Sequence, residues 1–160
     1  MKTIQIKKVL IALDYDPTAQ KVAETGFSIA NVLEAEVILL HVVSNPVYYS
    51  SLEYSAIMGF DGYTYANPIQ LDSKEGIKKA SLLYLESTKK HLGDNKIKIV
   101  VNEGDFATSI LETAKKEHAD IIVMGSHSKK WLEDILMGSV AEEVLRKTKI
   151  PLLIIPTKKK

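Results

Sequence analysis

Short apolar runs recur along the chain, and a stretch with helical spacing separates each run from the next. Most of the runs are apolar on both faces, which is typical of strands that helices cover on both sides. The run at 97–101 alternates with a lysine and suits a strand nearer an edge. The runs are Val9–Leu13, Val37–Val43, Ile97–Val101, Ile121–Met124 and Leu152–Ile155. Their alternation with helices predicts an α/β fold, an open parallel sheet covered on both faces.

The helical stretches carry signals for their beginnings and for their packing. Asp16 followed by Pro17 predicts an N-cap and the first helical residue, and Asp72 or Ser73 is expected to cap the next helix. Gly26 lies on the apolar stripe of the first helix. A glycine at such a position indicates that the helix packs closely on the sheet.

Composition restricts the protein class more than the function. A length of 160 residues favours a single domain spanning 1–160. The net charge of +1 gives no reason to expect nucleic acid or an acidic membrane as a partner. The chain contains no cysteine, which excludes disulfides, thiol catalysis and cysteine-ligated zinc. No apolar stretch follows Met1, so a cytoplasmic location is the default expectation.

A long connection without a regular pattern spans about residues 44–71. It contains two prolines and several tyrosines, among them Tyr48, Tyr49, Tyr54, Tyr63 and Tyr65. Connections of this length within one domain are uncommon and are usually lids, interface elements or disordered segments. The tyrosines could cover a bound ligand or contact a partner chain, and a merely flexible loop is the alternative.

The stretch from Ile121 to Val140 carries the strongest local motif. Gly125 ends an apolar strand at a point where tight curvature or positive φ is expected. Gly138 and Ser139 then open a helix, and Ser139 with Glu142 three residues later forms a capping-box pattern. A helix that begins there presents free N–H groups and the positive end of its dipole. The motif therefore predicts an anion-binding site.

The spacing from Gly125 through Ser128 to Gly138–Ser139 resembles the phosphate-binding signature of universal stress proteins, in which a third glycine normally occupies the place of Ser128. The resemblance extends from the strand that ends at Asp14 to the final Pro151–Ile155, and among family members it is to the ATP-binding branch. It implies a Rossmann-like, five-stranded parallel sheet in the order 3-2-1-4-5. The first and fourth strands are then neighbours, and the site is expected at the switch point between them.

The same resemblance implies which residues bind the nucleotide. The expected ligand is ATP, or AMP or ADP, with magnesium beside the phosphates and its protein ligands unassigned. Asp14 is expected at the ribose or adenine end, and the backbone of Val42 at the adenine edge. The expected site residues are Asp14, Val42, Met124, Gly125, His127, Ser128, Gly138, Ser139 and Val140. Those from Gly125 onward would lie mainly against the phosphates.

Nearby polar residues leave several interpretations open. Lys129 and Lys130 could neutralise the phosphates or could simply be solvated. Asp16 could be a magnesium ligand, although an N-cap is the simpler role. His41 interrupts a buried strand and is expected to be a hydrogen-bonded structural residue, because no partner with metal-ligand spacing lies nearby.

The chain shows no recognisable catalytic motif. It has no Walker loop, no Gly-x-Ser-x-Gly elbow and no paired acids apart from Asp14 and Asp16. ATP is therefore expected to act as a bound signal and to be hydrolysed slowly at most. The alternative is a dimeric interaction protein whose phosphate site is blocked by Ser128. An adenylate-forming enzyme is a third hypothesis, and the absence of a His-x-Gly-His element speaks against it.

The last strand suggests how the protein assembles. Leu152–Ile155 is apolar, and the order implied by the resemblance places it at an edge of the sheet, where an uncovered strand invites pairing. Universal stress proteins commonly dimerise through this strand. We therefore expect a homodimer formed by antiparallel pairing of Leu152–Ile155 between two chains.

Overall fold

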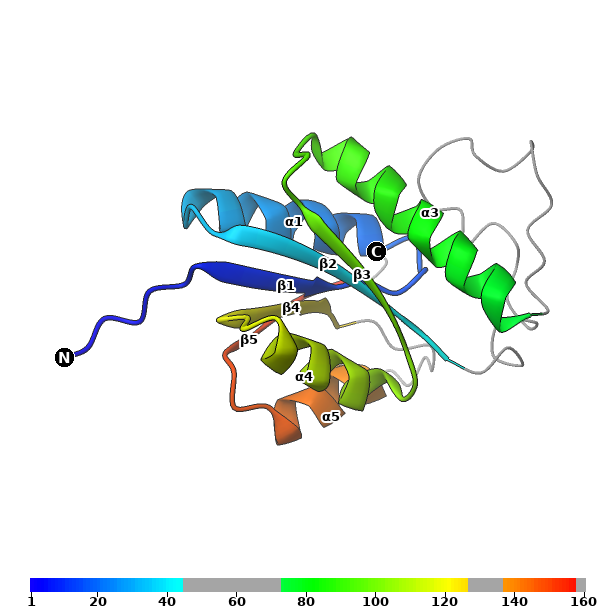
Figure 1. Cartoon of the computed structure of the whole chain (residues 1–160). Helices are drawn as coiled ribbons and strands as arrows, with labels where there is room; N and C mark the ends of the chain where they lie inside the picture. Colours follow the sequence, from blue (N-terminus) through cyan, green and yellow to red (C-terminus); the bar gives the residue numbers. More distant parts are fainter. Residues whose placement is uncertain (45–72, 127–136, 158–160) are drawn as a thin grey trace.

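The computed structural model describes residues 1–44, 73–126 and 137–157. Its core is a parallel sheet of five strands in the order β3-β2-β1-β4-β5 (Figure 1). The strands are β1 (Lys8–Ala12), β2 (Glu36–Val43), β3 (Lys98–Glu103), β4 (Ile121–Gly125) and β5 (Leu152–Ile155). The predicted α/β class, strand order and edge position of the third strand are confirmed. The tyrosine-rich connection beyond Ser44 and Lys158–Lys160 lie outside the described residues.

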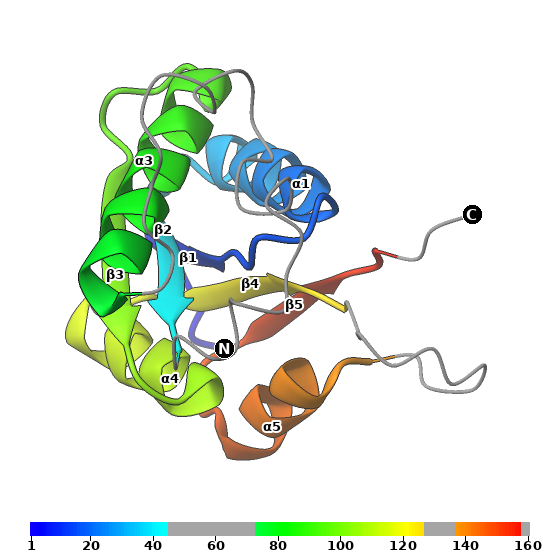
Figure 2. The same ribbon diagram turned by 90° about the vertical axis from the view of Figure 1, so that its right-hand side faces the viewer.

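Helices cover both faces of the sheet. They are α1 (Ala19–Val32), α3 (Lys74–Leu92), α4 (Phe106–Lys116) and α5 (Ser139–Lys147). Figure 2 shows α1 and α3 on one face and α4 and α5 on the other. Side chains alternate accordingly along β1: Ile11 packs with the core under α1 and α3, and Leu10 packs with the core under α4 and α5. Burial on both faces explains the continuous apolar runs.

Side chains cap the starts of two helices, and Ser73 is one of the two caps expected for the second helix from the sequence. Ser73 caps α3, and its hydroxyl accepts the N–H of Gly76 over 3.0 Å. Asp105 caps α4, and its carboxylate accepts the N–H of Thr108 over 3.0 Å. In both cases a side-chain oxygen satisfies an amide that has no partner within the helix.

The expected start of α1 is wrong by two residues. The helix begins at Ala19 with Thr18 at the cap, whereas Pro17 was expected to be its first residue. The carboxylate of Asp16 accepts the backbone N–H and the hydroxyl of Thr18, over 2.9 and 2.8 Å. An aspartate that bonds the amide two residues on stabilises a turn, and this turn delays the helix.

The expected capping box of α5 is also wrong. Gly138 is the N-cap, and Ser139 is the first helical residue with an exposed side chain. The carbonyl of Gly138 accepts the N–H of Glu142 over 2.9 Å. The Ser139 side chain is therefore already within the helix, one position too late to cap it.

The expected close packing at Gly26 is confirmed. A Cβ atom at this position would lie 2.9 Å from Cδ1 of Ile11 and 3.2 Å from Cγ1 of Val123. The two contacted residues belong to β1 and β4. The absence of a side chain at Gly26 therefore lets α1 approach the two central strands.

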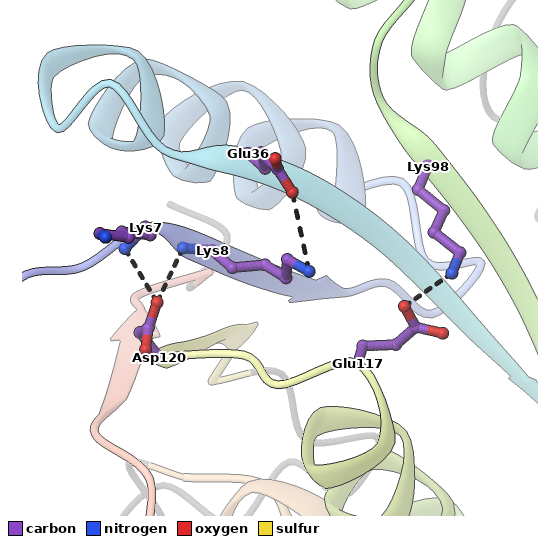
Figure 3. Close-up of polar contacts among 6 residues, drawn as sticks. All are labelled: Lys7, Lys8, Glu36, Lys98, Glu117 and Asp120. Carbon is purple, nitrogen blue, oxygen red and sulfur yellow. Dashed lines mark hydrogen bonds and ion pairs between the residues drawn. The ribbon is translucent and has the colours of Figure 1, made fainter.

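Polar contacts join the elements at the amino ends of the strands (Figure 3). One carboxylate oxygen of Asp120 accepts the backbone N–H groups of Lys7 and Lys8, over 2.8 and 2.9 Å. The ammonium of Lys98 lies 2.6 Å from the carboxylate of Glu117. The Asp120 contacts hold the start of β1 beside the start of β4, and the Lys98–Glu117 pair joins the start of β3 to the end of α4. Across the described ranges, no helix is long and apolar enough to span a bilayer.

Candidate functional site

A cavity of about 480 Å³ opens at the carboxyl ends of β1, β2 and β4. It lies where the strand order reverses between β1 and β4, which is the usual ligand position in an open α/β sheet. Its walls come from the sheet ends, α1, the first turns of α4 and α5, and the residue Thr157 after β5. A cavity of this size accommodates a small organic ligand.

The structure places most of the expected site residues around this cavity. Those that line it are Asp14, Val42, Met124, Gly125, Ser139 and Val140. Gly138 is buried next to Ser139, at the cap of α5. Gly125 is the last residue of β4 and pairs with Ile155 of β5. His127 and Ser128 lie outside the described residues, as do Lys129 and Lys130.

Two buried side chains fix the backbone at the Asp14 end. His41, from β2, is buried, and its Nδ1 donates to the carbonyl of Leu13 over 2.8 Å. The hydroxyl of Tyr84, from α3, donates to the carbonyl of Asp14 over 2.9 Å. The Asp14 side chain is exposed, and its carboxylate accepts the N–H of Asp16 over 3.0 Å. The expectation that His41 is structural is therefore confirmed.

Aromatic contacts surround the His41 ring. Its centroid lies 5.8 Å from that of Tyr15 and 5.9 Å from that of Tyr84, and both contacts are edge-on, with interplanar angles of 62° and 80°. Such edge-to-face contacts orient the ring in addition to burying it. Its hydrogen bond to Leu13 is consequently held in a fixed direction.

The two buried groups are uncharged at neutral pH. Burial lowers the pKa of His41 to about 4, although the hydrogen bond to Leu13 acts in the opposite direction. Burial also raises the pKa of Tyr84, and the carboxylates of Asp14 and Asp16 add to this increase. The charge at this end of the cavity therefore comes from carboxylates, which can accept hydrogen bonds from the hydroxyls of a sugar.

The first turn of α5 forms another part of the cavity wall. Ser139, Val140 and Glu142 line the cavity there. Amides at a helix start have no intrahelical acceptor and carry the positive end of the helix dipole. An anionic group of a ligand is therefore favoured at Ser139, whereas the carboxylate of Glu142 restricts how far along the helix that group can extend.

Much of the remaining cavity wall is apolar. Val42 and Met124 come from the sheet, Phe106 and Ile110 from α4, and Met137 from the segment before α5. These side chains suit a flat, weakly polar group. The cavity therefore combines a carboxylate at Asp14, an apolar wall and the amides at the start of a helix.

Sequence reasoning missed some of the lining residues. Phe106 is the first residue of α4, and Thr157 follows β5, so each lies just beyond a recognisable element on the carboxyl side of the sheet. Their position on the carboxyl side of the sheet is the signal that could have identified them as lining residues. For a metal, the described residues contain no cluster of three or more histidine, aspartate or glutamate side chains.

Comparison with known proteins supports a family assignment. The model of the universal stress protein family matches residues 5–156. Universal stress protein MJ0577 from Methanocaldococcus jannaschii is 30% identical over 159 residues, which are 98% of each chain. Universal stress protein YxiE from Bacillus subtilis is 26% identical over 151 residues, which cover 92% of this chain and 97% of the relative.

Solved structures agree with this assignment. The structure of MJ0577 has a TM-score of 0.72 at 29% identity and covers 98% of this chain and 100% of its own. A universal stress protein in complex with cAMP has a TM-score of 0.63 at 18% identity and covers 97% and 100%. One from Archaeoglobus fulgidus in complex with dAMP has a TM-score of 0.57 at 16% identity and covers 95% and 99%. The last two similarities concern the fold alone.

Proposed function

The chain belongs to the universal stress protein family, and from this premise we propose that it binds ATP as a dimeric stress-response or signalling protein. The observation that carries the proposal is the set of groups that line one cavity at the switch point. A carboxylate at Asp14, an apolar wall and the first turn of α5 all border it. A ribose, a base and a phosphate chain would each meet a suitable surface there.

Each part of the ligand has a defined counterpart in the proposal. The ribose lies near Asp14, the adenine edge meets the backbone of Val42, and the base packs against Met124 and its apolar neighbours. The phosphates lie against Gly125, Gly138, Ser139 and Val140. Small residues at the first three positions would let backbone amides approach the phosphate oxygens, and the Ser139 hydroxyl would add a donor.

Magnesium would accompany the triphosphate in this proposal. Mg²⁺ commonly takes its ligands from phosphates, water and one or two carboxylates. Such a site needs no cluster of protein ligands, which agrees with the absence of one among the described residues. The cation would neutralise phosphate charge close to Glu142. Hydrolysis is expected to be slow at most, so the bound nucleotide would act as a signal.

The proposed site is tested by titration calorimetry with ATP and AMP. Asp14→Ala should weaken the binding of both by about tenfold, since a carboxylate hydrogen bond is lost. Asp94→Ala is the matched control. Asp94 is half-buried, and its carboxylate likewise accepts the N–H two residues on, from Lys96, but it lies away from the cavity. Equal affinities of the two variants would contradict the assignment of Asp14.

Gly138→Val tests the phosphate end. Gly138 has φ −69° and ψ 157°, a conformation that valine adopts without strain. The added side chain should abolish ATP binding while thermal unfolding stays cooperative. Unchanged ATP affinity would refute the phosphate assignment. Mass spectrometry of any nucleotide released from the denatured wild-type protein would identify the natural ligand directly. No bound nucleotide and no titration signal would favour the alternative, a family member whose phosphate site Ser128 blocks.

Dimerisation is proposed through the outer edge of β5. This strand is last in the sheet order and pairs with β4 on one side. Leu152, Leu153 and Ile154 are each partly exposed, so a second copy could bury them while satisfying the backbone groups of the edge. Light scattering at micromolar concentration should give the mass of two chains. The mass of one chain would overturn the proposal.

A further inference from the structure

Ser126, directly after β4, connects three segments that meet at one end of the cavity. Its N–H donates to the carbonyl of Ile155 over 2.9 Å, and its carbonyl accepts the N–H of Gly138 over 3.0 Å. Its hydroxyl oxygen accepts the N–H of Thr157 over 3.1 Å. The end of β5, Thr157 two residues beyond it and the cap of α5 are thus all bonded to one half-buried serine.

A bond to Ser126 holds the cap residue of α5. Gly138 has no side chain that could fix the cap, and its N–H is bonded to a residue outside the helix. The carbonyl of Ser126 supplies this contact. The direction in which the first amides of α5 face the cavity therefore depends on the orientation of the Ser126 peptide group.

The hydroxyl of Ser126 also constrains the orientation of the Ser126 peptide group, through its bond to Thr157. Thr157 is 5% exposed and lines the cavity, and its amide is bonded to the Ser126 hydroxyl. The preceding carbonyl, of Pro156, accepts the ammonium of Lys21 in α1 over 2.8 Å. The segment after β5 is therefore anchored to α1 and β4, and through the hydroxyl it anchors Ser126.

We propose that Ser126 is a positioning residue, which orients the start of α5 for the phosphates of the ligand without contacting them. This inference rests on the proposed function and adds a residue to it. A preorganised set of amides binds an anion more tightly than a mobile set, because less order has to be imposed on binding. The Ser126 hydroxyl should thus matter for ATP and be nearly neutral for adenosine, which lacks phosphates.

The test compares ATP and adenosine by titration calorimetry on the full-length protein. Ser126→Ala keeps both backbone bonds and removes the acceptor of the Thr157 amide. We expect its affinity for ATP to fall by about tenfold, equivalent to one hydrogen bond, and its affinity for adenosine to change by less than about twofold. Ser126→Thr restores a hydroxyl and should recover most of the ATP affinity.

Thr148→Ala is the matched control. The Thr148 hydroxyl bonds the N–H and the carbonyl of Ile150, within the connection between α5 and β5 and away from the cavity. If loosening this connection were the cause, Thr148→Ala would weaken ATP binding as much as Ser126→Ala. That result would overturn the inference. An unchanged ATP affinity of Ser126→Ala, or an equal loss of affinity for ATP and adenosine in this variant, would overturn it as well.

A second measurement needs no ligand and separates this inference from the proposed function. Amide hydrogen exchange of Gly138, followed by NMR, should be at least about tenfold faster in Ser126→Ala than in wild type or Thr148→Ala. A wild-type protein that binds neither ATP nor adenosine would refute the proposed function. Unchanged Gly138 exchange in Ser126→Ala would refute the positioning role whether or not a nucleotide binds.

Discussion

The hydroxyl of Tyr84, in α3, donates to the backbone carbonyl of Asp14, 70 residues earlier in the chain, over 2.9 Å. The carbonyl of the preceding residue, Leu13, accepts Nδ1 of His41 from β2. Two buried side chains from two different elements thus hold consecutive carbonyls at the end of β1. Asp14 is exposed, whereas its backbone is held in place by side chains of the protein core.

Tyr84→Phe should loosen this arrangement without opening a cavity. The variant removes the hydroxyl and leaves the Asp14 carbonyl without this donor. We expect the free energy of unfolding to fall by about 1 kcal/mol and nucleotide affinity to fall several-fold. Urea denaturation and calorimetric titration measure the two effects. Thr88→Val is the control, because that buried hydroxyl donates within α3 to the Tyr84 carbonyl. Equal losses of affinity in both variants would show that the contact with Asp14 is not what matters.

His41 should make stability depend on pH. Its pKa is about 4 in the folded protein and near 6.5 in the unfolded chain, because burial disfavours the charged ring. The unfolded state therefore binds more protons between pH 4 and 6.5, so the free energy of unfolding rises with pH across this window. The contribution is fully present above pH 6.5 and is lost toward pH 4, with a total of roughly 3 kcal/mol.

His41→Asn isolates this effect. Asparagine can place an N–H near the position of Nδ1 but does not titrate, so the rise of stability between pH 4 and 6.5 should become shallower. Urea denaturation at several pH values measures the slope. His118→Asn, at an exposed histidine with φ 56° that asparagine tolerates, shows whether the loss of any histidine has the same result. An unaltered slope in His41→Asn would refute the prediction.

Gly26→Ala should destabilise the packing of α1 on the sheet. Alanine favours a helix over glycine by about 1 kcal/mol, but overpacking costs about 1–3 kcal/mol. We expect a net loss of about 1 kcal/mol in denaturant unfolding, since the new Cβ would lie 2.9 Å from Cδ1 of Ile11. Ile11→Val removes that atom. The double variant should therefore be more stable than the sum of the two single changes predicts, and simple additivity would argue against this contact as the cause.

Asp120→Ala should lower stability and leave the binding site intact. Its carboxylate accepts two backbone amides at the start of β1 (Figure 3), whereas the cavity lies at the carboxyl ends of the strands. We expect a loss of about 1 kcal/mol in the free energy of unfolding, with unchanged nucleotide affinity. Glu36→Ala serves for comparison, because the Glu36 side chain is 79% exposed and forms an ion pair with Lys8 over 3.7 Å. Such exposed pairs contribute less than about 0.5 kcal/mol.

Part of the candidate site could be predicted because it follows from local patterns. The strand at Leu152–Ile155 has the predicted bounds, and Asp14 and Gly125 lie at carboxyl ends of strands as expected. The prediction that both residues line one cavity depended on the strand order. This order came from the family resemblance and is confirmed. The roles of His127 and Ser128 stay predictions, because both lie outside the described residues.

The errors at the helix starts have a common cause. Ser139 and Asp16 are residue types that cap helices, but each also has other ways to satisfy nearby amides. Asp16 bonds Thr18 in a turn, and the cap next to Ser139 is fixed by a contact with Ser126. A local sequence pattern identifies the residues that could cap a helix but does not determine which of them does.

The amino-acid sequence by itself determined that apolar strands alternate with helices, because strand and helix periods are properties of neighbouring residues. It also determined that an acid and a glycine follow two of these strands. Only the tertiary structure decided that Tyr84 holds Asp14 and that Ser126 joins Gly138 to Thr157. These contacts join segments up to 70 residues apart, and whether they form depends on how the helices pack on the sheet.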